Sequence, residues 1–96
     1  MKNYELALVL IPSLSEEDKL ANLEKAKELI TRFGGEITNV DDWGKRKLAY
    51  EINKQREGFY YFIQFKAETS VPAELESRFR IMETALRYLI VRLDEE

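Results

Sequence analysis

The sequence contains neither cysteine nor histidine in its 96 residues. Without cysteine the chain has no disulfide, no thiolate nucleophile and no zinc site of the usual thiolate kind. Without histidine it lacks the commonest general base and metal ligand. Only four glycines and two prolines are present, which excludes a collagen-like or low-complexity chain. We therefore expect a globular protein that is not an enzyme, with no catalytic residue, metal site, cofactor or small-molecule substrate.

Long apolar runs are also missing. The longest, from Leu6 to Ile11, is far shorter than the roughly 20 residues with which a helix crosses a bilayer. The first residues, Met1 to Tyr4, lack the basic region, apolar core and small-residue cleavage site of a secretory signal. A cytoplasmic location and no membrane partner are therefore expected.

Positive charge is in overall deficit, because 15 Lys and Arg residues stand against 18 Asp and Glu residues and the net charge is −3. Such a chain does not bind any nucleic acid through bulk charge alone, since that affinity scales with the number of phosphates neutralised. The deficit is uneven: residues 1–44 carry five basic and nine acidic side chains, whereas residues 45–92 carry ten basic and six acidic ones. Any positive surface is thus predicted in the second half of the chain.

Apolar residues, which make up 45% of the chain, recur with the spacing of strands and of helices in turn. The first helix has a capping-box-like start at Ser15 and Asp18, and Gly34-Gly35 supplies its stop. Gly44 is a candidate bulge or bend between the two halves of the strand that follows. In order, the predicted elements are a strand at 4–11, a helix at 15–33, one long or interrupted strand over 36–43 and 48–52, a hairpin connection at 53–58, a strand at 59–67, a helix at 70–82 and a strand at 85–93.

This order, with a helix in each of two crossovers, predicts an α+β fold, the ferredoxin-like split β-α-β sandwich (βαββαβ). In that fold a four-stranded antiparallel sheet carries both helices on one face. A chain of this length forms one hydrophobic core, so residues 1–96 are predicted to be a single domain.

Alternation along the strands separates the two faces of this sheet. The residues predicted to face the helices are Leu6, Leu8, Leu10, Phe59, Tyr61, Ile63, Phe65, Leu86, Tyr88 and Ile90. Those predicted on the opposite, outer face are Ala7, Val9, Tyr60, Phe62, Arg87, Leu89 and Val91. Such an apolar open face is large for a free monomer, which predicts a partner over part of it. The alternative is that these side chains stabilise cross-strand pairs and stay half exposed without any partner.

Three shorter patterns leave alternatives open. The stretch from Arg56 to Phe65 partly matches the base-stacking motif of RNA-recognition sheets, but it has an extra residue before its aromatic core. The run Lys45-Arg46-Lys47 suits either phosphate binding or the protection of a solvated strand edge. Adjacent Asp41 and Asp42 in an extended segment point to opposite faces, so they cannot share a metal ion or a proton.

Residues 42–54, Asp-Trp-Gly-Lys-Arg-Lys-Leu-Ala-Tyr-Glu-Ile-Asn-Lys, closely resemble the signature of the bacterial small-subunit ribosomal protein S-six family, which is roughly Trp-Gly-x-Arg-x-Leu-Ala-Tyr-x-Ile-x-Lys. Tyr4-Glu5, Gly58-x-Tyr60 and the segments 79–82 and 86–88 are also similar to the family, in register over nearly the whole chain. The resemblance implies the same fold. It also implies a protein of the small subunit's platform that binds the central domain of 16S rRNA as a heterodimer with ribosomal protein S-eighteen and contributes to subunit assembly and translation.

Carried over position by position, the resemblance implies two sets of site residues. The rRNA-binding set is Lys2, Arg80, Arg87 and Arg92. The set for the protein partner is Lys45, Arg46, Leu48, Tyr50, Ile52, Tyr60 and Phe62. The chain departs from the family pattern at Glu51, where many members have proline, and in its short C-terminal tail, Asp94-Glu95-Glu96. The alternative function is a ferredoxin-like module that pairs sheet to sheet with itself and does not bind RNA.

Overall fold

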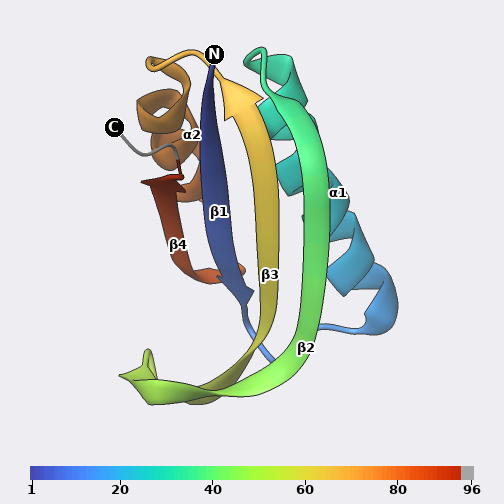
Figure 1. Ribbon diagram of the computed structural model, residues 1–96. Coiled ribbons are helices and arrows are strands. Elements are labelled where there is room, and N and C mark those ends of the chain that lie inside the picture. Colours follow the sequence, from blue (N-terminus) through green and yellow to red (C-terminus); the bar gives the residue numbers. More distant parts are fainter. Residues whose placement is uncertain (94–96) are drawn as a thin grey trace.

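The strands and helices follow one another along the chain in the order that the sequence predicts. The computed structural model describes residues 1–93, with the elements β1 (Lys2–Leu10), α1 (Glu16–Arg32), β2 (Glu36–Ile52), β3 (Gln55–Ala67), α2 (Val71–Phe79) and β4 (Ala85–Arg92). The strands form one antiparallel sheet in the order β2-β3-β1-β4. Both helices pack behind this sheet in the view of Figure 1. The fold is therefore the predicted ferredoxin-like α+β sandwich.

The first helix, α1, begins and ends at the predicted signals. The Ser15 side-chain oxygen accepts a hydrogen bond from the Asp18 backbone N–H at 3.1 Å, which satisfies one of the donors left free in the first turn. At the other end Gly34 adopts φ +93°, a left-handed conformation that glycine enters without steric cost. Its N–H donates to the Thr31 carbonyl at 3.0 Å. The chain then turns back into β2.

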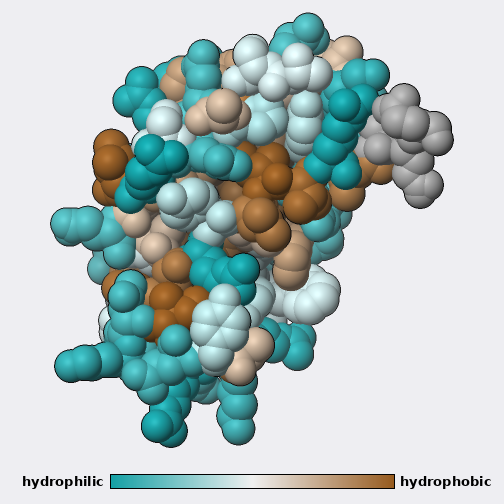
Figure 2. Space-filling model, turned by 90° about the vertical axis from the view of Figure 1, so that its left-hand side faces the viewer, coloured by the Kyte–Doolittle hydropathy of each residue, from teal (hydrophilic) through white to brown (hydrophobic). Residues whose placement is uncertain are grey.

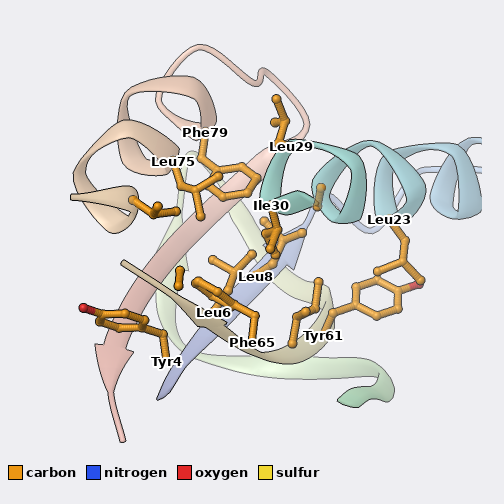
Figure 3. Packing of buried hydrophobic residues seen from close by; sticks show 14 of the residues in the cluster. Tyr4, Leu6, Leu8, Leu23, Leu29, Ile30, Tyr61, Phe65, Leu75 and Phe79 are labelled. Atoms are coloured by element: carbon orange, nitrogen blue, oxygen red, sulfur yellow. The ribbon is translucent and has the colours of Figure 1, made fainter. Parts of the chain in front are cut away.

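The core lies between the helices and the inner face of the sheet, as Figure 3 shows. Its fully buried large side chains are Leu6, Leu8, Leu10, Ile30, Tyr61, Ile63, Phe65, Leu75 and Phe79. Phe59, Tyr88 and Ile90 are partly buried and pack against this cluster. The inward prediction is therefore confirmed on β1 and β3, and for Tyr88 and Ile90 on β4.

The prediction that Leu86 faces the helices is wrong. Alternation along β4 is interrupted by a shift of register: Val9 lies opposite Arg87, but the next residue, Leu10, lies opposite Ala85. Leu86 is the extra residue of this bulge. Its Cδ1 lies 3.6 Å from the position of a Cβ on Gly58, beside the Val9 side chain. The bulge thus gives the inward position to Ala85 and turns Leu86 toward the outer-face residue Val9.

Element ends differ from prediction at two further places. The helix predicted to reach residue 82 ends at Phe79, and a tighter turn follows in which Met82 N–H donates to the Phe79 carbonyl at 3.0 Å. Met82 still packs against the core from this turn, which explains its helix-like spacing. The predicted six-residue hairpin connection is a two-residue turn at Asn53 and Lys54, whose φ values are 48° and 66°.

The side chain of Tyr61 places a polar group in the core. The hydroxyl of Tyr61 is buried against α1 and has no hydrogen-bond partner within residues 1–93. Burial, with smaller contributions from the carboxylates of Asp42 and Glu16, raises the pKa of this phenol to about 12. The folded state therefore holds the proton of Tyr61 over a pH range in which the unfolded chain has lost it.

Replacing Tyr61 with phenylalanine is expected to stabilise the protein by about 1 kcal/mol at pH 7, because a buried hydroxyl without a partner costs free energy. The stability linked to the raised pKa is present below pH 10 and is lost as the pH rises toward 12, so Tyr61→Phe should also flatten the fall in stability over that range. Urea denaturation at several pH values measures both effects. Tyr60→Phe, one position along β3 and facing the other way, is the control and should change stability by less than about 0.5 kcal/mol.

Candidate functional site

The outer face of the sheet, turned away from both helices, carries the predicted apolar side chains. Leu89 and Val91 on β4 are 50% and 41% exposed, whereas Val9 on the central strand β1 is only 4% exposed because larger neighbours flank it. Seen from the β4 side, Figure 2 shows apolar groups in patches that polar side chains separate. Within residues 1–93, this is the face of the sheet that no helix covers.

A shallow hollow of about 200 Å³ lies on this face. Its lining residues are Ala7 and Val9 of β1, Tyr60 and Phe62 of β3, and Arg87 and Leu89 of β4. The register explains the depression, because the small side chains of Ala7 and Val9 stand on the middle strand with larger ones on both sides. These six residues together are called the hollow.

Trp43 also lies on the outer face, although it was not among the residues predicted there from sequence. The pairing of β2 with β3 shifts between Asp42 and Gly44, so that Trp43 is the extra residue of a bulge. Gly44 has φ +72°, and its N–H donates to the Asp42 carboxylate at 2.9 Å. The Trp43 ring lies 4.7 Å from the ring of Phe62 at 59° and stays 52% exposed. The bulge predicted at Gly44 is therefore confirmed, but the outward direction that it gives to Trp43 was not predicted.

The hairpin arm, residues 44–58, contains most of the segment that resembles the family signature, which begins two residues earlier at Asp42. It extends past the body of the sheet and curves toward the β4 side, as the lower part of Figure 1 shows. The side chain of Arg87 reaches it: Nη1 donates to the Tyr50 hydroxyl at 3.2 Å, and the guanidinium lies 5.8 Å from the Tyr50 ring centroid. This contact joins the arm to one wall of the hollow.

The arm also forms a groove of about 440 Å³, whose lining includes Leu48 and Tyr50. Leu48 and Ile52 are partly exposed. Glu51 lies 3.6 Å from Arg56 across the arm in a surface ion pair. The arm therefore presents several of the predicted partner residues together, close to the outer face.

The basic run of β2 does not form one patch. Lys45 lies opposite the inward residue Phe59, with its Nζ 5.3 Å from that ring centroid. Arg46 turns to the other side, where its Nε donates to the Trp43 carbonyl at 2.9 Å and its guanidinium lies 5.7 Å from the Trp43 ring centroid. Alternation thus separates these neighbouring cations, and Arg46 supports the tryptophan of the outer face.

The four residues predicted to bind rRNA lie in different places. Lys2 begins β1 and Arg92 ends β4; these ends are adjacent, because Leu93 N–H donates to the Asn3 carbonyl at 2.8 Å. Lys2 is two residues before the buried Tyr4 on β1, and Arg92 lies opposite Tyr4 on β4. Because every second residue of a strand points to the same face, both lie on the helix side of the sheet. Arg80 follows α2, also on the helix side. Arg87 is on the outer face, apart from the other three.

Among residues 1–93 no cluster of three or more His, Cys, Asp or Glu side chains could hold a metal ion. In the same range, no helix is long and apolar enough to cross a membrane. The tail Asp94-Glu95-Glu96 lies outside the described residues. On one side of the sheet the structure thus brings together an apolar hollow, an exposed tryptophan and an adjoining hairpin arm.

Comparison with known proteins shows the family to which this chain belongs. The family model described as "Ribosomal protein S6" matches residues 3–92. Small ribosomal subunit protein bS6 of Thermoanaerobacter pseudethanolicus is 50% identical over 95 residues, which are 99% of this chain and all of the relative. The bS6 protein of Moorella thermoacetica is 47% identical over 96 residues, all of this chain and 98% of the relative. The crystal structure of 30S ribosomal protein S6 from Thermotoga maritima superposes with a TM-score of 0.90 at 33% identity, covering 95% of this chain and 86% of that one. The chain therefore belongs to the bacterial ribosomal protein S6 family, a family of ribosomal proteins and not of enzymes.

Proposed function

We propose that this chain is a structural protein of the small ribosomal subunit that binds the central domain of 16S rRNA together with ribosomal protein S-eighteen. Its place is on the ribosome in the cytoplasm, and its role is in subunit assembly and translation. Residues 1–96 act as one binding domain. The observation that carries the proposal is the open apolar face of the sheet beside the hairpin arm that bears most of the family signature.

The two proposed partners contact different sides of the molecule. The protein partner binds the outer face and the arm, where Trp43, Tyr50 and Phe62 supply aromatic area of the kind enriched in interface hot spots. RNA phosphates bind on the helix side, near the adjacent strand ends that carry Lys2 and Arg92. Arg80 also lies on the helix side and adds to the proposed RNA surface. Arg87 lies at the edge of the surface proposed for the protein partner.

Charge favours joint rather than separate binding. The chain has a net charge of −3, so its own affinity for an RNA backbone is expected to be low. A basic partner that covers the outer face would supply most of the phosphate contacts. The heterodimer, and not the chain alone, is therefore the proposed RNA-binding unit.

The experiment that tests this proposal measures binding of the purified chain to a labelled central-domain fragment of 16S rRNA, with and without S-eighteen, at two salt concentrations. We expect tight binding only when the partner is present, and weaker binding at the higher salt concentration. Light scattering of the chain alone should give the mass of a monomer. No RNA binding under either condition, with a tight homodimer in light scattering, would replace the proposal with the self-pairing module.

Replacing Lys2 and Arg92 together by alanine is expected to weaken RNA binding of the heterodimer without affecting its formation. The slope of log affinity against log salt should fall by about 0.7 to 0.9 for each phosphate that the variant no longer neutralises. Filter binding at several salt concentrations measures the slope. The control removes two cations from α1, Lys25→Ala with Arg32→Ala, and should leave the slope as it is. A slope that the Lys2 and Arg92 changes do not alter would remove this end of the sheet from the RNA surface.

A further inference from the structure

We propose that the hollow receives one aromatic or branched aliphatic side chain of a basic protein partner, and that Glu5 binds a cation of the same partner segment. The partner is the one named above, so this binding mode rests on the proposed function. It adds the chemistry by which the outer face would recognise that partner.

The shape of the hollow follows from two rows of side chains that cross the sheet. In one row Ala7 lies between Phe62 and Leu89. In the next, Val9 lies between Tyr60 and Arg87. Each row thus has a small or medium side chain on β1 and larger ones on β3 and β4. The hollow is a depression over β1, open to solvent and walled on both sides.

The size and lining of the hollow select the kind of side chain that fits. Apart from Arg87, its lining residues are aliphatic or aromatic. Its volume is about 200 Å³. Apolar cavities of about 150 Å³ take up benzene, so one aromatic ring or one branched aliphatic side chain would fill this space. Burial of such a side chain against a central apolar pocket is typical of an interface anchor.

Arg87 closes one end of the hollow, and its guanidinium is already bound to Tyr50. Arg87 donates to the Tyr50 hydroxyl at 3.2 Å and stacks on the same ring at 5.8 Å. Because the arm holds its guanidinium, Arg87 forms a wall beside Val9. A partner segment is therefore expected to continue toward the opposite end of β1.

The Glu5 carboxylate stands at that opposite end, and the Asp41 carboxylate lies further across the sheet, opposite Phe62. Glu5, two residues before Ala7 on the same face of β1, accepts a hydrogen bond from the Gln64 amide at 2.5 Å. The Asn39 amide donates both to Gln64 at 2.9 Å and to the Asp41 carboxylate at 3.1 Å. These donors are amides, so they orient the two carboxylates without neutralising them.

The charges and the hollow together favour a basic protein segment over the other occupants. Along a strand, two residues span about 6.6 Å, so a segment lying over β1 would place a cation at Glu5 when its apolar side chain enters above Ala7. An RNA phosphate at that end would be repelled by the carboxylates. A second copy of this chain would bring Arg46, Lys66 and Arg87 as its outer-face cations. Arg46 and Arg87 already donate within their own chain, to the Trp43 carbonyl and the Tyr50 hydroxyl, and Lys66 stands four residues beyond Phe62 on β3.

The test is to fill the hollow by enlarging Ala7, the small residue at its base. Ala7→Leu adds apolar volume on a residue whose side chain points away from the core. We expect S-eighteen to bind this variant about 10-fold to 100-fold more weakly, by calorimetry, with an unchanged melting temperature. Ala21→Leu makes the same change on the exposed side of α1 and should bind as the wild type does. Leu89→Ala, which removes a wall at a half-exposed position, should also weaken binding.

Glu5→Gln tests the cation site separately, because it keeps the shape and a hydrogen-bond acceptor for Gln64 but removes the charge. We expect weaker binding of S-eighteen and a smaller loss of affinity between low and high salt than in the wild type. Unchanged affinity and salt dependence would refute the cation site.

The outcomes separate this binding mode from the proposed function. If the wild-type chain does not bind S-eighteen, the proposed function fails and the hollow has no such occupant. If the wild type binds but Ala7→Leu and Leu89→Ala bind equally well, the partner avoids the hollow and only the binding mode is refuted. If Ala7→Leu instead weakens RNA binding in the absence of S-eighteen, or dissociates a homodimer in light scattering, the occupant is RNA or a second copy and the binding mode is again refuted.

Discussion

Replacing Phe62 with glutamate is expected to weaken binding of the protein partner by about 100-fold or more, while lowering the free energy of unfolding by only about 1 kcal/mol. Phe62 stands at the centre of the outer face, in contact with Trp43 and opposite both Ala7 and Asp41. In the free protein a carboxylate at this partly exposed position can stay hydrated. In the complex it would be buried without a cation and next to Asp41, which is strongly unfavourable.

The matched control for this prediction is Leu20→Glu. Leu20 is a large apolar residue of α1 that is 53% exposed on the other side of the molecule. It should change neither the partner affinity nor the melting temperature appreciably, because nothing is proposed to cover it. Calorimetric titration with S-eighteen gives the affinity, and urea denaturation gives the stability. If Phe62→Glu reduces both quantities to the same extent, Phe62 belongs to the core and the assignment of the outer face is wrong.

The element order and most of the burial pattern could be predicted from sequence because they depend on local signals. The cap at Ser15 and the stop at Gly34 are set within a few residues, and alternation along β1 and β3 divides the two faces. The bulge at Gly44 was predicted and is confirmed, but the bulge at Leu86 and the effect of either bulge on side-chain direction were not predicted. A bulge depends on how two strands pair, so neither the displacement of Leu86 nor the outward position of Trp43 was predicted.

The site was predictable in its composition but not in its geometry. Tyr60 and Phe62 were placed on the outer face by parity alone, and the structure agrees. The hollow, however, exists only because Ala7 falls between Phe62 and Leu89, which requires the register of three strands. The contact of Tyr50 with Arg87 joins residues 37 positions apart, and no local pattern indicates it. Family membership came from the resemblance at residues 42–54, which composition could not have supplied.

The division of the basic residues between two sides is a further result that sequence spacing conceals. Lys2 and Arg92 lie at opposite ends of the chain, yet β1 and β4 bring them to one end of the sheet. Arg87 is only five residues from Arg92 but lies on the other face of the sheet. Arg87 is opposite the outer-face residue Val9, whereas Arg92 is opposite the core residue Tyr4. A protein surface and an RNA surface can therefore coexist on a small sheet, because alternation assigns neighbouring side chains to different faces.

Replacing Phe79 with alanine is expected to destabilise the protein by about 3 to 5 kcal/mol, a larger effect on folding than that of any change on the outer face. Phe79 ends α2, is fully buried, and lies 6.2 Å from the ring of Tyr88 on β4. Truncation would leave a cavity between the helix and the sheet at the place where α2 is held. Domains of this size have free energies of unfolding of about 5 to 15 kcal/mol, so this change would remove a large part of the stability.

Ile81→Ala is the matched control for this change, because Ile81 lies two residues further on and is 75% exposed. It should alter stability by less than about 0.5 kcal/mol. In urea denaturation, Phe79→Ala should move the midpoint down by about 2 M and leave the slope unchanged, whereas Ile81→Ala should leave both as they are. Equal shifts for the two variants would mean that α2 is anchored by the turn after it rather than by the core. The outer face lies on the opposite side of the sheet, so a Phe79→Ala protein that still folds should bind the partner with its normal affinity.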